Sequence, residues 1–435
     1  MDSLIKKSTD NPETSVIAGF FYQKDSDEEI AAIKEELESL LKTAGGLSIK
    51  FFFQKKNKIN NKYLFGIGKI EEIKSYIDDN NIDLILIYNS LSNVQQRNLE
   101  SYLEIKVIDR TRLILDVFAL RARTVKGKLQ VELAQLLYFL PKLKGKGIEL
   151  SRLGGGIGTR GPGETKLETD RRKINKRISI IKKKLKKLDV NRKNLKSLKG
   201  NSLIPVISLA GYTSAGKSTI FNCLTTEKTY VTAKMFSTLD PLIRKMSFSG
   251  ERAGYYCFLT DTVGFIRKMP SEVIEAFKST LEEISDADLI LNIMDISDRR
   301  IIDKKKEVEE VFGKLNISSE KVLNIYNKVD LSDLSGNDII PFEYKNSSNI
   351  YISALKCDGI GVLKDRIFRK VFSDFKRFRI VVDKSDKGIS NLNRWAIVTK
   401  KNITGNKINM EILTTEKKML KFVTGHSEVF YEVLK

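Results

Sequence analysis

Cysteine, proline and histidine are scarce in this sequence of 435 residues, which contains three, seven and one of them. The cysteines, Cys223, Cys257 and Cys357, are isolated, odd in number and set within apparent core segments. A disulfide framework therefore has little support, and we expect reduced cysteines that serve packing. With His426 alone, catalysis built on histidine is disfavoured as well.

Long hydrophobic runs are also missing. No apolar run approaches the roughly 18 residues that span a bilayer, the first ten residues lack the apolar core of a signal peptide, and no lipidation motif is present. Because 30% of the residues are charged and 41% are hydrophobic, the length suits two to four globular domains. We expect a cytoplasmic protein without a membrane anchor, and a monomer.

Acidic residues are fewer than basic ones: the chain has 55 Asp and Glu and 76 Lys and Arg, which gives a net charge of +21. Such an excess predicts a polyanionic partner, RNA or DNA in preference to a membrane. The alternative is a solubility preference or a lysine-rich codon bias. The location of the positive charge along the chain distinguishes the two.

Residues 1–118 alternate short apolar runs with helical segments. Strands are expected at 15–22, 47–53, 82–88 and 106–108, with helices between them, the later two near 69–78 and 92–103. A capping box from Ser26 to Glu29 opens the first helix, and Gly45 and Gly46 close it. This βαβα order predicts a parallel sheet covered by helices.

A glycine-lysine turn precedes the second of these helices. Gly66, Gly68 and Lys69 either bind a phosphate there or form a plain turn at the start of the helix. The spacing by itself favours the plain turn.

Residues 119–200 contain two matching hydrophobic seams. Leucines stand at 129, 133, 136, 140 and 143, and isoleucines and leucines at 174, 178, 181, 185, 188 and 195. That spacing places each set along one side of an α-helix. Joined by one polar connection, the two helices most economically form an antiparallel hairpin, unless each seam packs on a different neighbouring domain.

The connection between these helices is glycine-rich, with six glycines from Gly154 to Gly163. Either it is disordered, or its backbone approaches RNA closely while its arginines bind phosphate or stack on bases. Fourteen Lys and Arg follow in 171–199 against one acid, Asp189, and phosphates can supply the missing counter-charge. We predict RNA contacts by Arg152, Arg160, Arg171, Arg172, Lys182, Lys183 and Lys184.

The stretch IPVISLAGYTSAGKST, from Ile204 to Thr219, is typical of a buried strand, a glycine-rich turn and the start of a helix. Two glycines let backbone N–H groups converge on a phosphate chain, and Lys217 then reaches the terminal phosphates. An ordinary strand-to-helix turn is disfavoured by the motifs that follow in order. The predicted nucleotide-binding residues here are Gly211, Tyr212, Thr213, Ser214, Ala215, Gly216, Lys217, Ser218 and Thr219.

Two later segments suit a nucleotide-dependent switch. Thr238 lies in a loop where its hydroxyl can complete a Mg²⁺ shell when a γ-phosphate is present. Asp261 ends an apolar strand and can hold the metal through water, while the N–H of Gly264 faces the γ-phosphate. We predict Ser218, Thr238 and Asp261 as metal ligands, Asp261, Thr262, Val263 and Gly264 as nucleotide contacts, and Lys217, Thr238 and Gly264 as catalytic residues.

The segment that follows the apolar strand 322–326 is predicted to recognise the base of the bound nucleotide. The Asp330 carboxylate accepts hydrogen bonds from N1–H and the exocyclic amine of guanine, which adenine cannot match, so the site should prefer GTP. Asn327 closes the base site and the Lys328 stem lies over the ring. Ser353 and Ala354, after the strand 349–352, complete the predicted guanine contacts.

Six stretches together resemble the HflX family of ribosome-associated GTPases: KLQVELAQLLYFLPKL, GGIGTRGPGETKLETDRR, GYTSAGKSTIFN, DTVGFIRKMP, EAFKSTLEE and NKVD. The resemblance implies binding to the large ribosomal subunit and its rRNA, insertion of the glycine-rich loop toward the peptidyl-transferase centre, and separation of ribosomal subunits under stress. It also implies nucleotide binding by the N-terminal domain. Ser214 and Lys166 depart from the usual Asn and Gln, and 53–64 lacks the usual prolines.

The residue after Gly264 is Phe265, where many proteins with this switch carry a water-orienting Gln. An apolar side chain cannot position the attacking water. We therefore expect slow intrinsic hydrolysis of GTP to GDP and phosphate, accelerated when the ribosome orders the switch loops.

We predict an α/β protein with four domains. These are a parallel α/β domain (1–118), the antiparallel helical hairpin with its glycine-rich tip (119–200), a P-loop GTPase domain with a mixed, mostly parallel sheet (201–373) and a small α+β domain (374–435). Two rival functions stay open: a GTP-gated RNA-binding or ribosome-assembly scaffold without significant turnover, and ATP-dependent RNA remodelling by the N-terminal domain.

Overall fold

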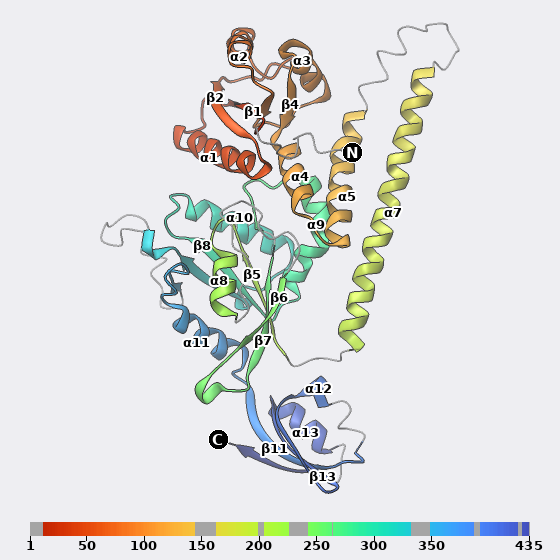
Figure 1. Cartoon of the computed structure of the whole chain (residues 1–435), viewed down its shortest axis with the longest axis vertical. Coiled ribbons are helices and arrows are strands. Elements are labelled where there is room, and N and C mark those ends of the chain that lie inside the picture. Colours follow the sequence, from red (N-terminus) through yellow and green to blue (C-terminus); the bar gives the residue numbers. More distant parts are fainter. Residues whose placement is uncertain are drawn as a thin grey trace. The chain divides into compact units, whose positions relative to one another are not determined.

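The computed structural model describes residues 12–143, 162–198, 204–225, 242–262, 264–331, 349–386, 392–424 and 429–434 (Figure 1). Backbone contacts divide the chain into two compact units. The first comprises Met1–Lys186, Thr232–Asp240 and Met269–Lys278, and the second comprises Lys187–Val231, Pro241–Lys268 and Ser279–Lys435. Among the described residues, no helix has both the length and the apolar character needed to cross a membrane.

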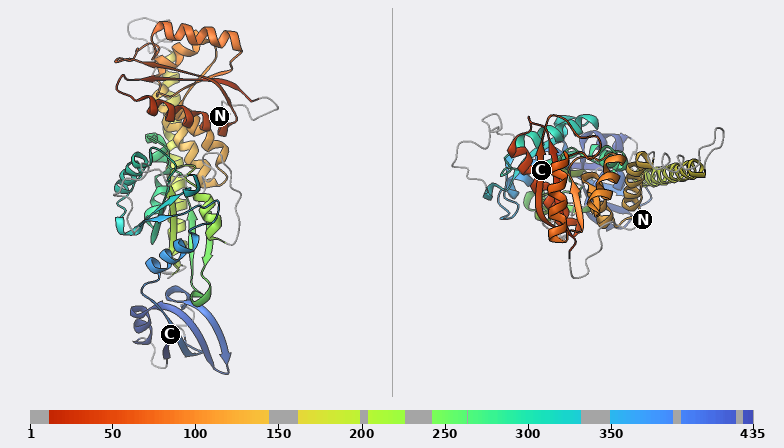
Figure 2. Two further views of the ribbon diagram at one scale, coloured as in Figure 1. Left: turned by 90° about the vertical axis from the view of Figure 1, so that its left-hand side faces the viewer. Right: turned by 90° about the horizontal axis from the view of Figure 1, so that it is seen from above.

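The first unit is built on a parallel four-stranded sheet in the order β2-β1-β3-β4. The elements are β1 (Thr14–Phe21), α1 (Asp27–Ala44), β2 (Leu47–Lys55), α2 (Ile67–Asn80), β3 (Leu84–Ile87), α3 (Asn93–Leu103) and β4 (Lys106–Asp109). Side chains of a strand point alternately to the two faces, so these apolar strands need cover on both. Helix α1 covers one face, and α2 and α3 cover the other (Figure 2). The predicted parallel α/β arrangement is confirmed.

Local signals set both ends of α1. The Ser26 hydroxyl accepts a hydrogen bond from the backbone N–H of Glu29 at 3.1 Å. Gly45 follows the last turn with φ at +98°, in the left-handed region that favours glycine. Both ends lie where the sequence predicted them.

Helix α4 (Arg110–Arg121) has no counterpart in the sequence-based prediction. It begins directly after β4, and the Asp109 carboxylate caps it by accepting from the N–H of Arg112 at 2.9 Å. Residues 110–118 are all buried, so the helix lacks the polar face on which an amphipathic pattern depends. Arg112 pairs with Asp116 at 3.1 Å within this interior, where burial raises the pKa of the Asp116 carboxyl to about 6.

Helices α5 (Val125–Lys142) and α7 (Pro162–Leu198) form the predicted antiparallel hairpin. Glu132 and Arg177 form an ion pair across it, with 2.6 Å between Oε1 and Nε. The predicted seams are buried at Leu133, Leu136, Ile178, Ile181 and Leu185. The prediction fails at Leu188, which is 37% exposed, because α7 with 37 residues is about twice as long as α5 with 18.

The second unit contains a six-stranded sheet in the order β10-β9-β8-β5-β7-β6, parallel except for β6. Its strands are β5 (Val206–Gly211), β6 (Leu242–Ser247), β7 (Tyr256–Asp261), β8 (Leu289–Asp295), β9 (Val322–Asn327) and β10 (Ile350–Tyr351). The mixed, mostly parallel sheet that the sequence predicted is confirmed.

The helices that accompany this sheet are α8 (Lys217–Leu224), α9 (Ser271–Ser285), α10 (Ile301–Lys314) and α11 (Ile360–Val371), with short 3₁₀ turns η2 (Gly250–Arg252), η3 (Ser319–Lys321) and η4 (Val329–Leu331). The unit boundary falls within α9, whose residues up to Lys278 belong to the first unit. Four strands end at Gly211, Asp261, Asp295 and Asn327. Parallel strands bring their carboxyl ends to one edge, where open α/β sheets bind ligands.

The C-terminal part of the second unit is an antiparallel four-stranded sheet in the order β12-β13-β11-β14. Its elements are β11 (Phe375–Asp383), α12 (Leu392–Trp395), β12 (Ile397–Thr404), β13 (Lys407–Thr415), α13 (Glu416–Thr424) and β14 (Phe430–Leu434). Alternate residues of β11, Phe378, Ile380 and Val382, are buried together with Met419 and Phe422 of α13. The predicted α+β character of this segment is confirmed.

The cysteines are not placed as the sequence suggested. Cys257 is buried, but Cys223 is only half-buried and Cys357 is exposed. The Sγ atoms of Cys223 and Cys357 lie 3.4 Å apart, although 134 residues separate them. These two thiols are free but not isolated. Their proximity arises from packing of α8 against the turn after β10, which sequence spacing does not reveal.

Candidate nucleotide-binding site

The predicted phosphate turn lies between β5 and α8 and has the backbone that its glycines require. Gly211, Ser214 and Gly216 have φ of +138°, +62° and +95°. A Cβ on Gly211 would overlap the backbone carbonyl of Ile293, and one on Gly216 would overlap the amide of Asn327. Both positions therefore combine a left-handed backbone with a close approach, and only glycine satisfies both conditions.

Lys217 is the first residue of α8 and is 7% exposed. Its Nζ donates to the carbonyl oxygens of Tyr212 at 2.6 Å and Gly211 at 3.1 Å. Burial lowers the pKa of this ammonium to about 8, against the opposing effect of the Asp261 charge. The cation is thus held in the phosphate turn by weak neutral acceptors, which a phosphate oxygen can replace with a stronger, charge-assisted bond.

Ser218 and Asp261 meet behind the phosphate turn. The Ser218 hydroxyl donates to Oδ2 of Asp261 at 2.9 Å, and Asp261 at the end of β7 is 1% exposed. Mg²⁺ prefers hard oxygen ligands of these two kinds. The donor set therefore fits the predicted metal. The third predicted ligand, Thr238, lies outside the described residues.

The segment after β7 is hydrogen-bonded to the phosphate turn. The N–H of Phe265 donates to the Gly211 carbonyl at 3.0 Å, and the N–H of Thr213 donates to the Phe265 carbonyl at 2.8 Å. A Cβ on Gly264 would lie 2.7 Å from Nζ of Lys217, so this glycine permits close contact with that cation. Thr262 anchors the preceding turn through a 2.6 Å bond to the Leu209 carbonyl. Val263 lies outside the described residues.

Asn327 links the phosphate turn to the predicted guanine loop. Its Nδ2 donates to the carbonyl of Ala215 at 2.9 Å, and its Oδ1 accepts from the N–H of Ala354 at 2.9 Å. The side chain is 2% exposed, so both bonds form away from water, where losing either partner is costly. Asn327 therefore braces the two loops against each other, and its role in closing a base site stays a prediction.

Asp330 and Lys328 flank this link. A hydrogen bond from the Ser353 hydroxyl lowers the pKa of the Asp330 carboxyl, which favours its ionised form. Lys328 has φ of +67°, and its Nζ pairs with Oδ2 of Asp295 at 2.5 Å. The residues predicted for phosphate, metal and guanine that the structure describes thus lie at one edge of the six-stranded sheet.

This geometry coincides with a clear relationship to known proteins. GTPase HflX from Caldanaerobacter subterraneus subsp. tengcongensis is 47% identical to this chain over 339 residues, which cover 78% of this chain and 77% of that relative. The chain belongs to the GTPase HflX family. GTPase HflX from Escherichia coli is 38% identical over 353 residues, or 81% of each chain.

Three family models divide the HflX relationship along the chain. The models described as GTP-binding GTPase N-terminal, GTP-binding GTPase Middle Region and 50S ribosome-binding GTPase match residues 32–119, 121–199 and 206–328. The crystal structure of a GTP-binding protein from Sulfolobus solfataricus in complex with GDP covers 82% of this chain and 99% of that chain, at 24% identity and a TM-score of 0.45. As an HflX family member, the chain is a GTP-binding GTPase.

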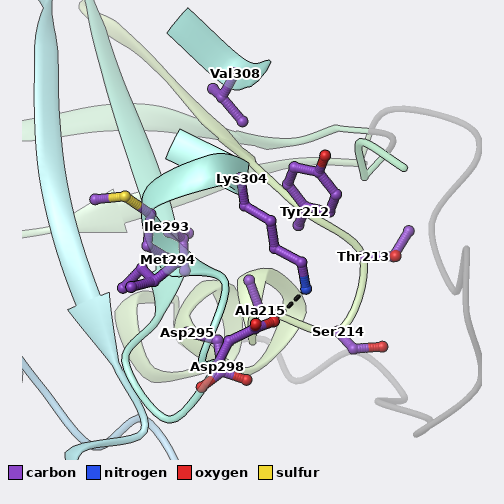
Figure 3. A pocket seen from close by; sticks show the side chains of 11 residues that line it. Tyr212, Thr213, Ser214, Ala215, Ile293, Met294, Asp295, Asp298, Lys304 and Val308 are labelled. Atoms are coloured by element: carbon purple, nitrogen blue, oxygen red, sulfur yellow. Dashed lines mark hydrogen bonds and ion pairs between the residues drawn. The ribbon is translucent and has the colours of Figure 1, made fainter. Parts of the chain in front are cut away.

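A pocket beside the phosphate turn contains residues that the sequence analysis missed (Figure 3). Its lining includes Asp298 and Lys304, which form an ion pair, and Tyr212, whose hydroxyl is hydrogen-bonded to Glu307. Lys304 also lies 5.1 Å from the centroid of the Tyr212 ring. Asp295 ends the apolar strand β8 and Asp298 follows it. That position was a readable signal, because it is where such sheets collect functional side chains.

The contacts of the glycine-lysine turn of the first unit suit a plain start of a helix. Gly66 precedes α2 in an extended conformation, and its N–H donates to Oε1 of Gln54 at 2.9 Å. Lys69 pairs with Glu72 at 2.5 Å.

The predicted RNA-binding residues divide into two groups. Arg152 and Arg160 lie outside the described residues. The other five are exposed on α7, namely Arg171, Arg172, Lys182, Lys183 and Lys184. Two of them have acidic partners, Arg172 with Glu168 at 2.5 Å and Lys182 with Glu275 at 2.7 Å.

Proposed function

We propose that this GTPase binds the large ribosomal subunit in its GTP-bound form and dissociates or rescues ribosomes under stress. The proposal rests mainly on the buried side chain of Asn327, which joins the phosphate turn to the predicted guanine loop. The strongly basic helix α7 is the second feature that supports it. The link suits a site whose loops respond together to a nucleotide, and the helix suits a phosphate backbone. Further support comes from the 50S ribosome-binding GTPase model that matches residues 206–328.

In this proposal GTP first captures the Lys217 ammonium. The cation exchanges the carbonyls of Gly211 and Tyr212 for oxygens of the β- and γ-phosphates, while the N–H groups of the phosphate turn receive the remaining charge. Asp330 selects guanine, and Ser353 and Ala354 close over the base. The buried bonds of Asn327 then transmit the position of the base loop to the phosphate turn.

Ser218, Asp261 and Thr238 are the residues that would hold Mg²⁺. When bound, the ion neutralises charge that develops on the transferred phosphoryl group. The Gly264 N–H faces the γ-phosphate, so the segment after β7 reports whether that phosphate is present.

Hydrolysis by the free protein is slow in this proposal. Phe265 is 3% exposed and its ring lies 6.3 Å from that of Phe312, centroid to centroid. The apolar ring is therefore packed away from any attacking water. A second component must orient that water, and the ribosome supplies it by ordering the switch loops.

The basic surface of α7 provides the affinity for rRNA. Lys183 and Lys184 are exposed next to Lys182, whose ammonium is already paired with Glu275. Lys183 and Lys184 therefore test the surface without breaking that ion pair. Each phosphate contact that is lost should flatten the dependence of log affinity on log salt by roughly one.

The test separates ribosomes from their subunits by sedimentation after incubation with the protein and either GTP or GDP. We expect dissociation with GTP and little with GDP. Lys183→Glu combined with Lys184→Glu should weaken binding to large subunits at least tenfold and reduce the salt slope by about two. The control combines Lys401→Glu and Lys407→Glu, two exposed lysines of β12 and β13.

Three results would count against the proposal. Equal losses in the two double variants would mean that overall charge matters and α7 does not. Unchanged binding by the α7 variant would remove this helix from the contact. GTP-dependent binding that leaves ribosomes intact would favour a GTP-gated scaffold instead of a dissociation factor.

A further inference from the structure

Two thiols meet at the back of the guanine loop. Cys223 lies on α8, the helix that begins with Lys217, and Cys357 lies in the turn from Ser353 to Asp358. Their Sγ atoms are 3.4 Å apart, whereas a disulfide bond is about 2.05 Å long. A small movement of the turn toward α8 would therefore join them.

Both thiols also point at one carbonyl. Sγ of Cys223 lies 3.3 Å from the Ala354 oxygen, and Sγ of Cys357 lies 3.9 Å from the same atom. The N–H of Ala354 is the group that binds Asn327 at 2.9 Å. Any covalent change at the two sulfurs thus acts on the residue that connects the guanine loop to the phosphate turn.

The turn that carries Cys357 is closed by its own backbone hydrogen bonds. Ser353 and Asp358 exchange two backbone hydrogen bonds, at 3.0 and 3.1 Å. Between them, Cys357 has φ of +56°, an uncommon left-handed conformation for a residue other than glycine. The tight bridge holds Cys357 on the outside of the turn, facing Cys223.

The two sulfurs differ in access to solvent. Cys357 is exposed and Cys223 is half-buried, so a dissolved peroxide reaches Cys357 first. Burial and the adjacent Cys357 raise the pKa of the Cys223 thiol to about 11, which suits the resolving partner better than the first thiol attacked. Cys257 is buried, and burial raises its pKa to about 12, so it stays reduced.

We propose that Cys223 and Cys357 form a reversible disulfide that displaces the guanine loop and weakens GTP binding. A peroxide oxidises the Cys357 thiol to a sulfenic acid and leaves as water or an alcohol. The Cys223 sulfur then attacks Cys357, the S–S bond forms, and the hydroxyl departs as water with the Cys223 proton. The peroxide takes up two electrons, and a dithiol reductant restores both thiols.

The direction of the effect follows from the contacts. The sulfurs must approach, so the turn that carries Ser353 and Ala354 shifts toward α8. The hydrogen bond from Ser353 to Asp330 and the one from Ala354 to Asn327 are both weakened by this shift. We expect GTP affinity to fall roughly tenfold, about the loss of one hydrogen bond to a charged group. This inference rests on the assignment of residues 353–354 to the guanine loop and is independent of ribosome binding.

The test treats the nucleotide-free, full-length protein with hydrogen peroxide. Three measurements follow: free thiols in denaturant, linked peptides by mass spectrometry without reductant, and GTP affinity before and after dithiothreitol. We expect free thiols to fall from three to one, a single peptide joining Cys223 to Cys357, and a tenfold loss of affinity that the reductant reverses. The exposed-site variant Cys357→Ser should keep its affinity under the same treatment.

Two outcomes would overturn the inference. Oxidation of Cys357 beyond the sulfenic acid without any linked peptide would show that the thiols cannot join. A linked peptide with unchanged GTP affinity would show that the bond does not reach the guanine loop. Ribosome dissociation plays no part in these measurements, so a failure here is distinct from a failure of the proposed function.

Discussion

Two glycine-lysine pairs at the starts of helices, Gly216-Lys217 and Gly68-Lys69, differ in how their surroundings are built. In the second unit, Gly216 ends the turn with φ of +95° and Lys217 is buried on backbone carbonyls. In the first unit, Gly68 lies inside α2 with nothing near its missing Cβ, and Lys69 pairs with Glu72. The same pair of residues therefore has different surroundings in the two units.

The backbone amides differ in the same way. The turn of the second unit follows β5 directly, so its N–H groups stand at the carboxyl edge of a parallel sheet. The N–H of Gly66 is already bonded to the Gln54 side chain at 2.9 Å. The turn of the second unit is thus distinguished by left-handed glycines, a buried lysine and its place at the end of a parallel strand, and a glycine-lysine pair alone does not suffice.

The largest expected difference between the turns concerns GTP affinity. Lys217→Ala removes the buried cation that is bonded to the carbonyls of the phosphate turn, and we expect at least a 100-fold loss, since charge-assisted bonds to phosphate are the strong ones. Lys69→Ala should leave GTP affinity within twofold. Fluorescent GTP titrations of both variants check this. A comparable loss in Lys69→Ala would assign nucleotide binding to the first unit as well.

Glycine substitutions should change stability in opposite directions. Gly216→Ala forces a Cβ into the Asn327 amide on a left-handed backbone, and we expect a loss of about 2 kcal/mol in the free energy of unfolding. Gly68→Ala adds a methyl group to a helix in open space and should gain about 0.5–1 kcal/mol. Urea unfolding curves of the two variants provide the comparison. Stabilisation by alanine at both positions would refute the distinction.

The smallest expected effect is the uptake of a proton by Lys217 when GTP binds. Because the pKa of Lys217 is lowered to about 8 in the nucleotide-free protein, phosphates that restore its charge must bring a proton along at alkaline pH. We expect an uptake of about 0.9 proton per GTP at pH 9 and about 0.1 at pH 7. Calorimetry in buffers of different ionisation enthalpy measures it.

The lowered pKa of Lys217 also makes the free energy of unfolding depend on pH. Below pH 8 the folded and unfolded proteins both carry the Lys217 charge, and the cost of burying it is fully present. Between pH 8 and the ordinary pKa of 10.5 the folded state sheds the proton first, so this group's contribution to stability rises with pH. Equal proton uptake at pH 7 and pH 9 would contradict the lowered pKa of Lys217.

Local sequence signals predicted much of this fold. The turn from Gly211 to Ser218 was readable because glycine geometry and spacing are local properties, and Ser26 and Gly45 marked the ends of α1 for the same reason. Helix α4 was missed because burial on all sides removes the amphipathic pattern. The contacts of Lys328 with Asp295 and of Cys223 with Cys357 were also missed, since they join elements far apart in the chain and depend on tertiary packing.

The most direct test of the central claim is GTP turnover by the purified protein with and without large ribosomal subunits, beside Lys217→Ala and Lys69→Ala. We predict slow turnover alone, strong stimulation by the subunits, loss of that stimulation in Lys217→Ala and its retention in Lys69→Ala. Fast turnover by the free protein would contradict the role given to Phe265. Stimulation that survives Lys217→Ala would show that hydrolysis takes place elsewhere than at the turn between β5 and α8.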